Sequence, residues 1–134
     1  MLEFVKGLVE KGLNINHQNK GDRTPLYYAI SNENVDIVNF LIENGADVNI
    51  IFDGGNTILT AYHRLTVNLM NIIIAAGTDV NHKNDRGITA LMQISMLISQ
   101  CQNECEYENM INMIKLLIEN GADINLKDNE GEQP

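Results

Sequence analysis

NKGDRTPLYYAISNENVDIVNFLIENGADVN, residues 19–49, carries the signals for two short helices joined by a turn. Thr24 and Pro25 predict the start of the first helix, because a threonine oxygen accepts hydrogen bonds from the free amides of a first turn and proline suits the first helical position. Polar residues at 32–34 interrupt the apolar pattern, and a second, strongly apolar helix follows. Gly45 stands where that helix needs a terminating residue with a left-handed backbone. The stretch therefore predicts one helix–turn–helix module.

The second helix of this module has apolar side chains on two sides. They form a stripe too wide for one partner helix to cover, made of Val35, Ile37, Val38, Phe40, Leu41 and Ile42. The ending of the module occurs four times, as GLNIN at 12–16, GADVN at 45–49, GTDVN at 77–81 and GADIN at 121–125. The closing asparagines are 33, 32 and 44 residues apart. Such a period predicts a row of stacked modules, each covering its neighbours.

This pattern resembles the ankyrin repeat family, whose Thr-Pro-Leu-His-x-Ala helix start is similar to TPLYYA at 24–29. The resemblance extends over nearly the whole chain and implies an all-α solenoid of helix–turn–helix units with β-hairpin fingers at right angles to the helices. We expect a single repeat domain over residues 1–134, divided into a half repeat at 1–18, repeats at 19–51, 52–83 and 84–127, and the start of a further repeat at 128–134. An array that opens with a half repeat or a cut from a longer chain would explain these partial ends, and we favour truncation.

The fourth repeat is 11 residues longer than a period of 33, and the extra residues lie between Ser95 and Asn109. Apolar residues recur there at helical spacing, and 11 residues make about three helical turns. We therefore expect a lengthened first helix that includes Cys101 and Cys105, followed by an acidic tip. The tip contains Glu104, Glu106, Tyr107 and Glu108, and the second helix is expected to resume at Met110.

The composition argues against several classes of function. Nine Lys and Arg against 18 Asp and Glu give a formal net charge of −9, which would repel a nucleic acid or an anionic membrane. Two cysteines give no disulfide framework, and the charged residues near the start of the chain are not typical of a secretory or membrane segment. We therefore expect a cytoplasmic protein that binds neither nucleic acid nor membranes.

No catalytic motif is present in the sequence, and we expect neither enzymatic activity, a cofactor nor a small-molecule substrate. Two features only resemble metal sites. The segment 47–49 starts like a calcium loop but lacks the ligands that should follow it. Cys101 and Cys105, four residues apart on the expected helix, supply two thiols where a closed zinc site needs four ligands. We expect no metal site and interpret both thiols as small apolar residues of the helix stripe.

The resemblance also implies where a partner would bind. In ankyrin arrays the finger tips and the exposed side of the first helices form a concave face that binds other proteins. Carried onto this chain, the implied partner-binding residues are Lys20, Arg23, Tyr28, Asn32, Asp53, Asn56, Arg64, Asp85, Arg86 and Met96. Tyr28 is the best candidate anchor, because aromatic side chains contribute disproportionately to interface energies. Each position is about as compatible with an ordinary solvated loop residue.

Taken together, these features predict a non-enzymatic protein-binding module. The excess of acidic side chains favours a basic partner. Two alternatives stay open at this point. One is a regulatory segment of a larger enzyme or channel, which the partial repeats at both ends would allow. The other is a metal or redox sensor that uses Cys101 and Cys105.

Overall fold

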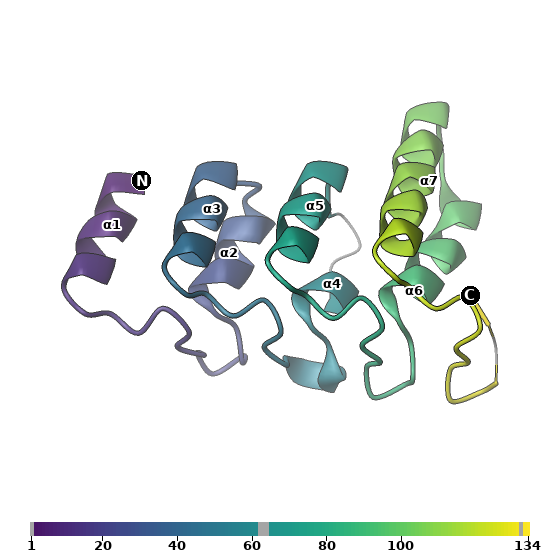
Figure 1. Cartoon of the computed structure of the whole chain (residues 1–134), viewed down its shortest axis with the longest axis horizontal. Helices are drawn as coiled ribbons and strands as arrows, with labels where there is room; N and C mark the ends of the chain where they lie inside the picture. Colours follow the sequence, from purple (N-terminus) through teal and green to yellow (C-terminus); the bar gives the residue numbers. More distant parts are fainter. Residues whose placement is uncertain (1, 62–64, 132) are drawn as a thin grey trace.

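A computed structural model of the chain describes residues 2–61, 65–131 and 133–134. Within these ranges the secondary structure is helical and no residue belongs to a β-strand. The helices stand in a row along the long axis of the molecule, with the two chain ends at opposite ends of the row (Figure 1). The elements in order are α1 (Leu2–Glu10), α2 (Pro25–Ser31), α3 (Val35–Glu43), η1 (Asp53–Gly55), α4 (Ile58–Ala61), α5 (Val67–Ala75), α6 (Ala90–Leu97), η2 (Ile98–Gln100) and α7 (Glu104–Glu119).

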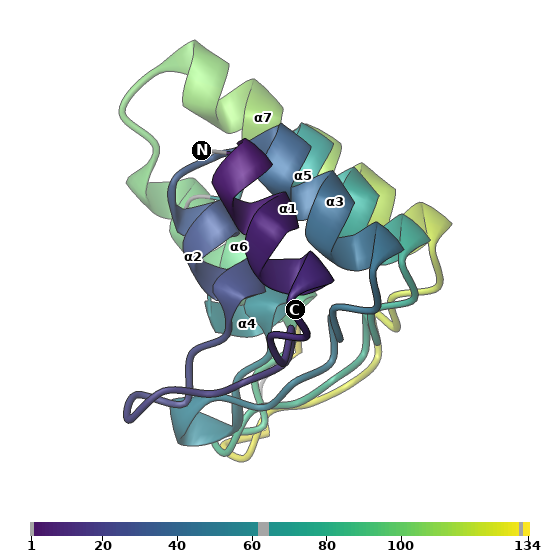
Figure 2. The ribbon, with the colours of Figure 1, turned by 90° about the vertical axis from the view of Figure 1, so that its left-hand side faces the viewer.

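The helices form two layers. Helices α1, α3, α5 and α7 stack in an outer layer, and α2, α4 and α6 stack in an inner layer beside it (Figure 2). Helix α2 packs on α3 and α6 packs on α7, while α1 packs on α3, α5 on α7 and α4 on α6. The loops that connect one repeat to the next project from the same end of both layers as fingers, whereas the connection between α6 and α7 lies at the opposite end (Figure 2). The predicted all-α solenoid is confirmed.

The start and end of the first complete helix pair follow the sequence signals. The Thr24 side-chain oxygen accepts a hydrogen bond from the Tyr27 amide at 3.3 Å, and Pro25 occupies the first position of α2. At the end of α3, Gly45 has a φ of 94°. The Ala46 amide donates a hydrogen bond to the Leu41 carbonyl at 2.9 Å. This is the 6→1 bond of a Schellman motif, which ends a helix at a residue with a left-handed backbone.

A continuous apolar strip runs between the layers. The largest apolar side chains that are almost completely buried are Leu26, Val38, Leu41, Ile58, Leu69, Met70, Ile73 and Leu117. They come from α2, α3, α4, α5 and α7, so several repeats contribute to one shared core. Helix α1, whose residues are all described, has no fully buried side chain, and Phe4 on it is 67% exposed. Helix α1 packs on α3, whereas α7, at the other end of the row, packs on both α5 and α6 and buries Leu117 completely. Burial in this fold therefore depends on the number of neighbouring helices.

An asparagine joins each repeat to the next. The Asn49 amide nitrogen donates to the Gly77 carbonyl at 3.1 Å, and the Asn49 amide oxygen accepts from the Asp79 backbone N–H at 2.9 Å. Asn16 and Asn81 make the same pair of bonds to the following repeat, at 3.1 and 2.8 Å and at 3.0 and 2.8 Å respectively. Because each asparagine binds backbone groups one repeat further along, the two bonds fix the spacing between repeats.

The fingers are closed by turns, and the predicted β-hairpin strands do not form in the described residues. Asn19 shows the local reason: its side-chain oxygen accepts from the amides of Gly21 and Arg23 at 2.9 and 3.1 Å. Side-chain bonds of this kind satisfy the backbone inside the turn, and no ladder is needed. In the first three fingers a backbone bond joins the two sides, with the N–H of Asn19, Phe52 and Asn84 donating to the carbonyls of Arg23, Asn56 and Ile88 at 3.0, 2.7 and 3.1 Å respectively.

One position of the finger has a left-handed backbone in every copy. Asp22, Gly55, Gly87 and Gly131 occupy it, with φ of 59°, 71°, 76° and 86°. The exchange of glycine and aspartate in the first finger therefore leaves the fold unchanged, because Asp tolerates this region better than most residues. Gly55 is needed for a second reason. A Cβ there would lie 2.8 Å from the Asp85 backbone nitrogen, because adjacent fingers approach closely.

The expected lengthening of the first helix in the fourth repeat is wrong. Helix α6 ends at Leu97, η2 follows, and α7 begins at Glu104, before the expected start at Met110. The Asn103 side-chain oxygen accepts from the Glu106 amide at 2.8 Å, so Asn103 caps a new helix. The acidic residues expected at a tip lie in the first turns of α7, where the helix dipole favours negative charge. The insertion has therefore lengthened the second helix.

Replacing Asn49 with alanine tests the bonds between repeats. We expect Asn49→Ala to lower the free energy of unfolding by about 1–3 kcal/mol, because it removes two hydrogen bonds and leaves their backbone partners unsatisfied. Urea unfolding followed by circular dichroism measures the change. Asn71→Ala, at an exposed position of α5, is the control and should stay within about 0.5 kcal/mol of the wild type. Equal midpoints for the two variants would show that the asparagine contributes no stability.

Replacing Gly55 with alanine tests the close approach of the fingers. Gly55→Ala should destabilise the protein by more than about 1 kcal/mol, since alanine suits neither the left-handed backbone nor the gap to Asp85. The matched variant is Gly21→Ala in the first finger, where a Cβ would meet nothing closer than 3.5 Å. Its melting temperature should match that of the wild type. Equal melting temperatures of the Gly55→Ala and Gly21→Ala variants would contradict this explanation.

Candidate functional site

The predicted partner-binding residues lie on the fingers and the inner helices, which face the same side of the molecule (Figure 2). Lys20 and Arg23 are on the first finger, Asp53 and Asn56 on the second, and Asp85 and Arg86 on the third. Tyr28 and Met96 are exposed residues of α2 and α6, and Asn32 follows α2 as its C-cap. Arg64 lies outside the described residues. Six of the nine others form two groups, with Arg23 and Tyr28 in the first and Asn56, Asp85, Arg86 and Met96 in the second.

The first group is built on aromatic side chains. The Arg23 guanidinium lies 4.9 Å from the centre of the Tyr27 ring, a distance suited to a cation–π contact. The Tyr27 and Tyr28 rings meet edge to face at 5.7 Å. The Tyr28 hydroxyl accepts from the Asn19 side-chain amide at 2.7 Å. Arg23 and Tyr28 are thus held in defined positions, while 43% of Tyr28 stays exposed.

Sequence reasoning missed Tyr27 as a member of this group. Its ring is half-buried and also packs edge to face on Phe52 at 5.2 Å. Phe52 belongs to the next repeat and is only 6% exposed, so the contact ties the first group to the second finger. The available signal was the family pattern itself, in which a histidine stands at the position of Tyr27.

The second group lines a hollow of about 450 Å³ between the second and third fingers and α6. It brings together Asn56, Asp85, Arg86 and Met96 from the predicted set. Met96 is 50% exposed and supplies an apolar surface beside two charged side chains. The hollow is also lined by Thr60, Gln93 and Leu97, which sequence reasoning missed. Gln93, Met96 and Leu97 share one face of α6 at helical spacing, so periodicity could have identified them.

Hydrogen bonds hold the floor of this hollow in place. The Asp85 amide donates to the Gly54 carbonyl at 3.0 Å, and the Asn84 side-chain amide donates to the Asn56 side-chain oxygen at 3.1 Å. A His82 ring nitrogen lies 2.7 Å from the Gly55 carbonyl. The second and third fingers therefore form one unit, and the side chains at their tips are displayed at fixed distances from α6.

Comparisons with known proteins match the repeats. A model describing three copies of the ankyrin repeat matches residues 1–52, and a single-repeat model matches residues 86–129. The ankyrin repeat protein FPV222 of Fowlpox virus (strain NVSL) is 32% identical over 142 residues, which cover 97% of this chain and 16% of the viral protein. The chain belongs to the ankyrin repeat family. Ankyrin repeats are generally protein–protein interaction modules.

Other relatives match shorter parts of the chain. Alpha-latrocrustotoxin-Lt1a of Latrodectus tredecimguttatus is 48% identical over 48 residues, 35% of this chain and 3% of the toxin. The ankyrin repeat domain-containing protein OPG015 of Monkeypox virus is 41% identical over 59 residues, 44% of this chain and 14% of that protein. The chain thus spans 16% or less of the length of these three relatives.

The ankyrin fold separates the two cysteines that the sequence placed on one helix. Cys101 lies in the coil after η2, half-buried, with its sulfur 3.3 Å from the Met110 sulfur. Cys105 is exposed on α7. Among the described residues no group of three or more His, Cys, Asp and Glu side chains could hold a metal ion. The same part of the chain contains no helix long and apolar enough to cross a membrane.

Proposed function

We propose that this ankyrin domain is a non-enzymatic module that binds a partner protein across its finger tips and inner helices. The observation that carries the proposal is the hollow beside α6. There, Asn56, Asp85 and Arg86 from two fingers lie around the exposed side chain of Met96, which belongs to an inner helix. An apolar centre with charged and amide groups at its rim is the usual composition of a protein-binding surface.

The proposed partner is a basic protein that also presents a carboxylate. A net charge of −9 attracts a basic surface and speeds its encounter with the domain. Within the hollow, Asp85 offers a carboxylate to a lysine or arginine of the partner. Arg86 offers paired donors to an aspartate or glutamate. Mixed charges of this kind set the orientation of the partner more than the affinity.

The rigidity of the face supports tight association. Arg23 is held by Tyr27, Tyr28 by Asn19, and the second and third fingers by each other. Side chains that are already ordered lose little conformational entropy on binding. We further propose a cytoplasmic location, on the basis of the two free cysteines.

A double replacement in the hollow tests this proposal. Arg86→Glu with Met96→Ser should reduce the partner proteins captured by the tagged domain at least about tenfold, because it removes the apolar centre and reverses a rim charge. Affinity purification from cells that express the protein, with quantitative mass spectrometry, measures the loss. Circular dichroism should show an unchanged melt, since both side chains are exposed.

The matched control is Lys115→Glu with Ile118→Ser on α7. Both positions are exposed, and the two double variants change the net charge and the exposed apolar area in the same way. We expect the control to capture the same partners as the wild type. If the control loses them and the hollow variant keeps them, binding takes place on the outer layer and the proposed face is wrong.

A further inference from the structure

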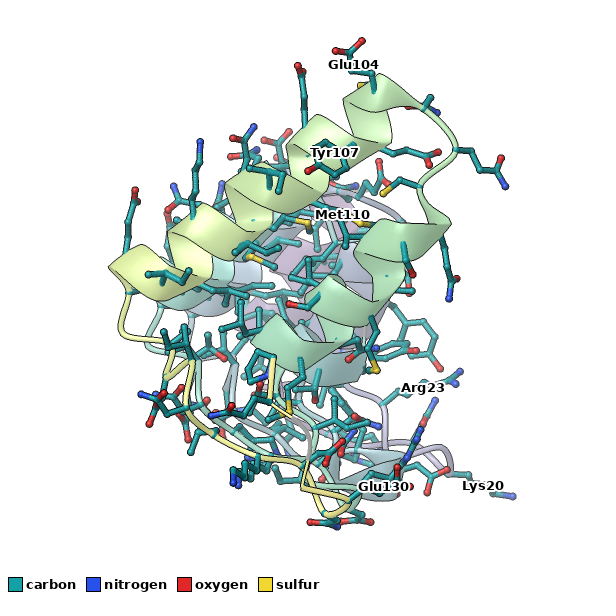
Figure 3. All side chains as sticks on the ribbon, turned by 90° about the vertical axis from the view of Figure 1, so that its right-hand side faces the viewer. Lys20, Arg23, Glu104, Tyr107, Met110 and Glu130 are labelled. Atoms are coloured by element: carbon teal, nitrogen blue, oxygen red, sulfur yellow. The ribbon has the colours of Figure 1, made fainter. Side chains whose placement is uncertain are left out.

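The insertion in the fourth repeat creates a second hollow, away from the finger tips. Helix α7 rises beyond the ends of the other outer helices (Figure 1). The hollow, about 720 Å³, lies between this raised end, the end of α6 and the start of α5. Figure 3 shows Glu104 and Tyr107 on the raised end of α7, on the opposite side of the molecule from Lys20 and Arg23. The hollow is therefore distinct from the finger tips that carry the first group.

The wall of this hollow is anchored at its base. The Glu106 carboxylate accepts from the Gln102 amide at 3.0 Å, and the Glu106 amide donates to the Asn103 side-chain oxygen at 2.8 Å. The Cys101 sulfur contacts the Met110 sulfur at 3.3 Å. These contacts tie the connecting segment to the first two turns of α7, so the raised end of the helix has a fixed direction.

Apolar and polar side chains both line the hollow. The apolar lining residues are Leu65, Val67, Leu97, Cys101, Met110 and Met113, and the polar ones are Thr66, Gln100, Gln102, Glu106 and Asn109. Glu106 is the charged residue among these described lining residues. Methionines adapt to differently shaped apolar partners, and grooves with apolar side chains accept the apolar face of an amphipathic helix. The helix dipole explains why glutamates begin α7, but it does not explain the apolar side chains beside them.

We propose that this hollow binds an amphipathic, basic helical segment of a partner protein. The apolar face of that segment lies on Met110 and Met113, and a lysine or arginine at its edge pairs with Glu106. The charge of the region supports this occupant. No Lys or Arg occurs between Arg86 and Lys115, whereas Glu104, Glu106 and Glu108 lie within the first turns of α7. A segment with acidic flanks would be repelled by this end of the molecule.

A designed peptide tests the proposal on the full chain. The probe is a fluorescein-labelled 14-residue peptide of leucine and lysine, with leucines at helical positions i, i+3, i+4 and i+7. We expect saturable binding in a fluorescence anisotropy titration. Glu106→Lys should weaken it at least about tenfold. Glu106→Gln, which keeps an oxygen that can accept from Gln102, should weaken it about threefold. The matched control Glu108→Lys changes the net charge equally but replaces a residue outside the lining, and should have less than about a twofold effect.

Methionine methyl NMR locates the peptide independently of the variants. The Met110 and Met113 methyl signals should shift on titration, while Met96, which lines the hollow beside the fingers, should not. The proposal is overturned if Met96 shifts and Met110 does not, or if Glu108→Lys weakens binding as much as Glu106→Lys. Equal binding of a leucine and glutamate peptide would also overturn it. Met110 shifts that depend on protein concentration alone would assign the hollow to a second copy of this chain.

Discussion

The outer helices of this protein bury their apolar sides against neighbouring repeats and against the layer of inner helices. This packing sets the spacing of the whole molecule. Leu41, Ile73 and Leu117 are almost completely buried in equivalent positions of three successive repeats, and Asn16, Asn49 and Asn81 bind across each boundary at nearly constant distances. The helix layer and the asparagine bonds therefore impose the same separation, one through packing and one through hydrogen bonds.

The separation set by the helices has consequences at the fingers. Neighbouring fingers approach so closely that a backbone hydrogen bond joins the second finger to the third. Gly55 and Gly87 each face the backbone of the next finger. The first finger carries Asp22 at the same position, and Gln18 links it to the second finger through the Ile51 carbonyl at 3.2 Å. A regular helix stack thus supports a face whose tips differ in chemistry from repeat to repeat.

Both hollows lie where the regular repeat is altered. The hollow beside the fingers adjoins α4 in the third repeat, which is one residue shorter than a period of 33. There the Thr57 hydroxyl is buried without a hydrogen-bond partner among the described residues, whereas its counterpart Thr24 caps α2. The other hollow exists because α7 extends beyond its neighbours. A perfect repeat covers each surface with the next copy, so recessed surfaces arise where one copy is shortened or lengthened.

Most of the correct predictions from the sequence rest on signals from residues close together in the chain. The caps at Thr24 and Gly45, the repeat period and the wide apolar stripe predicted the helices and their stacking, because each depends on residues close together in the chain. The same reasoning placed the insertion in the wrong helix. Cys101 and Cys105 fit the period of either a longer α6 or a longer α7, and the choice depended on the cap formed by Asn103 and on the packing of Met110. Periodicity alone could not separate these two solutions.

The sequence by itself determined that this chain is an array of stacked repeats and which residues lie on its fingers and inner helices. The tertiary structure decided which of them meet. It joined Asn56, Asp85, Arg86 and Met96 around one hollow, brought Arg23 onto Tyr27, and opened a second hollow beside the insertion. The physical reason is that helix signals act over a few neighbouring residues, whereas the distance between side chains of different repeats depends on how each repeat packs against the next.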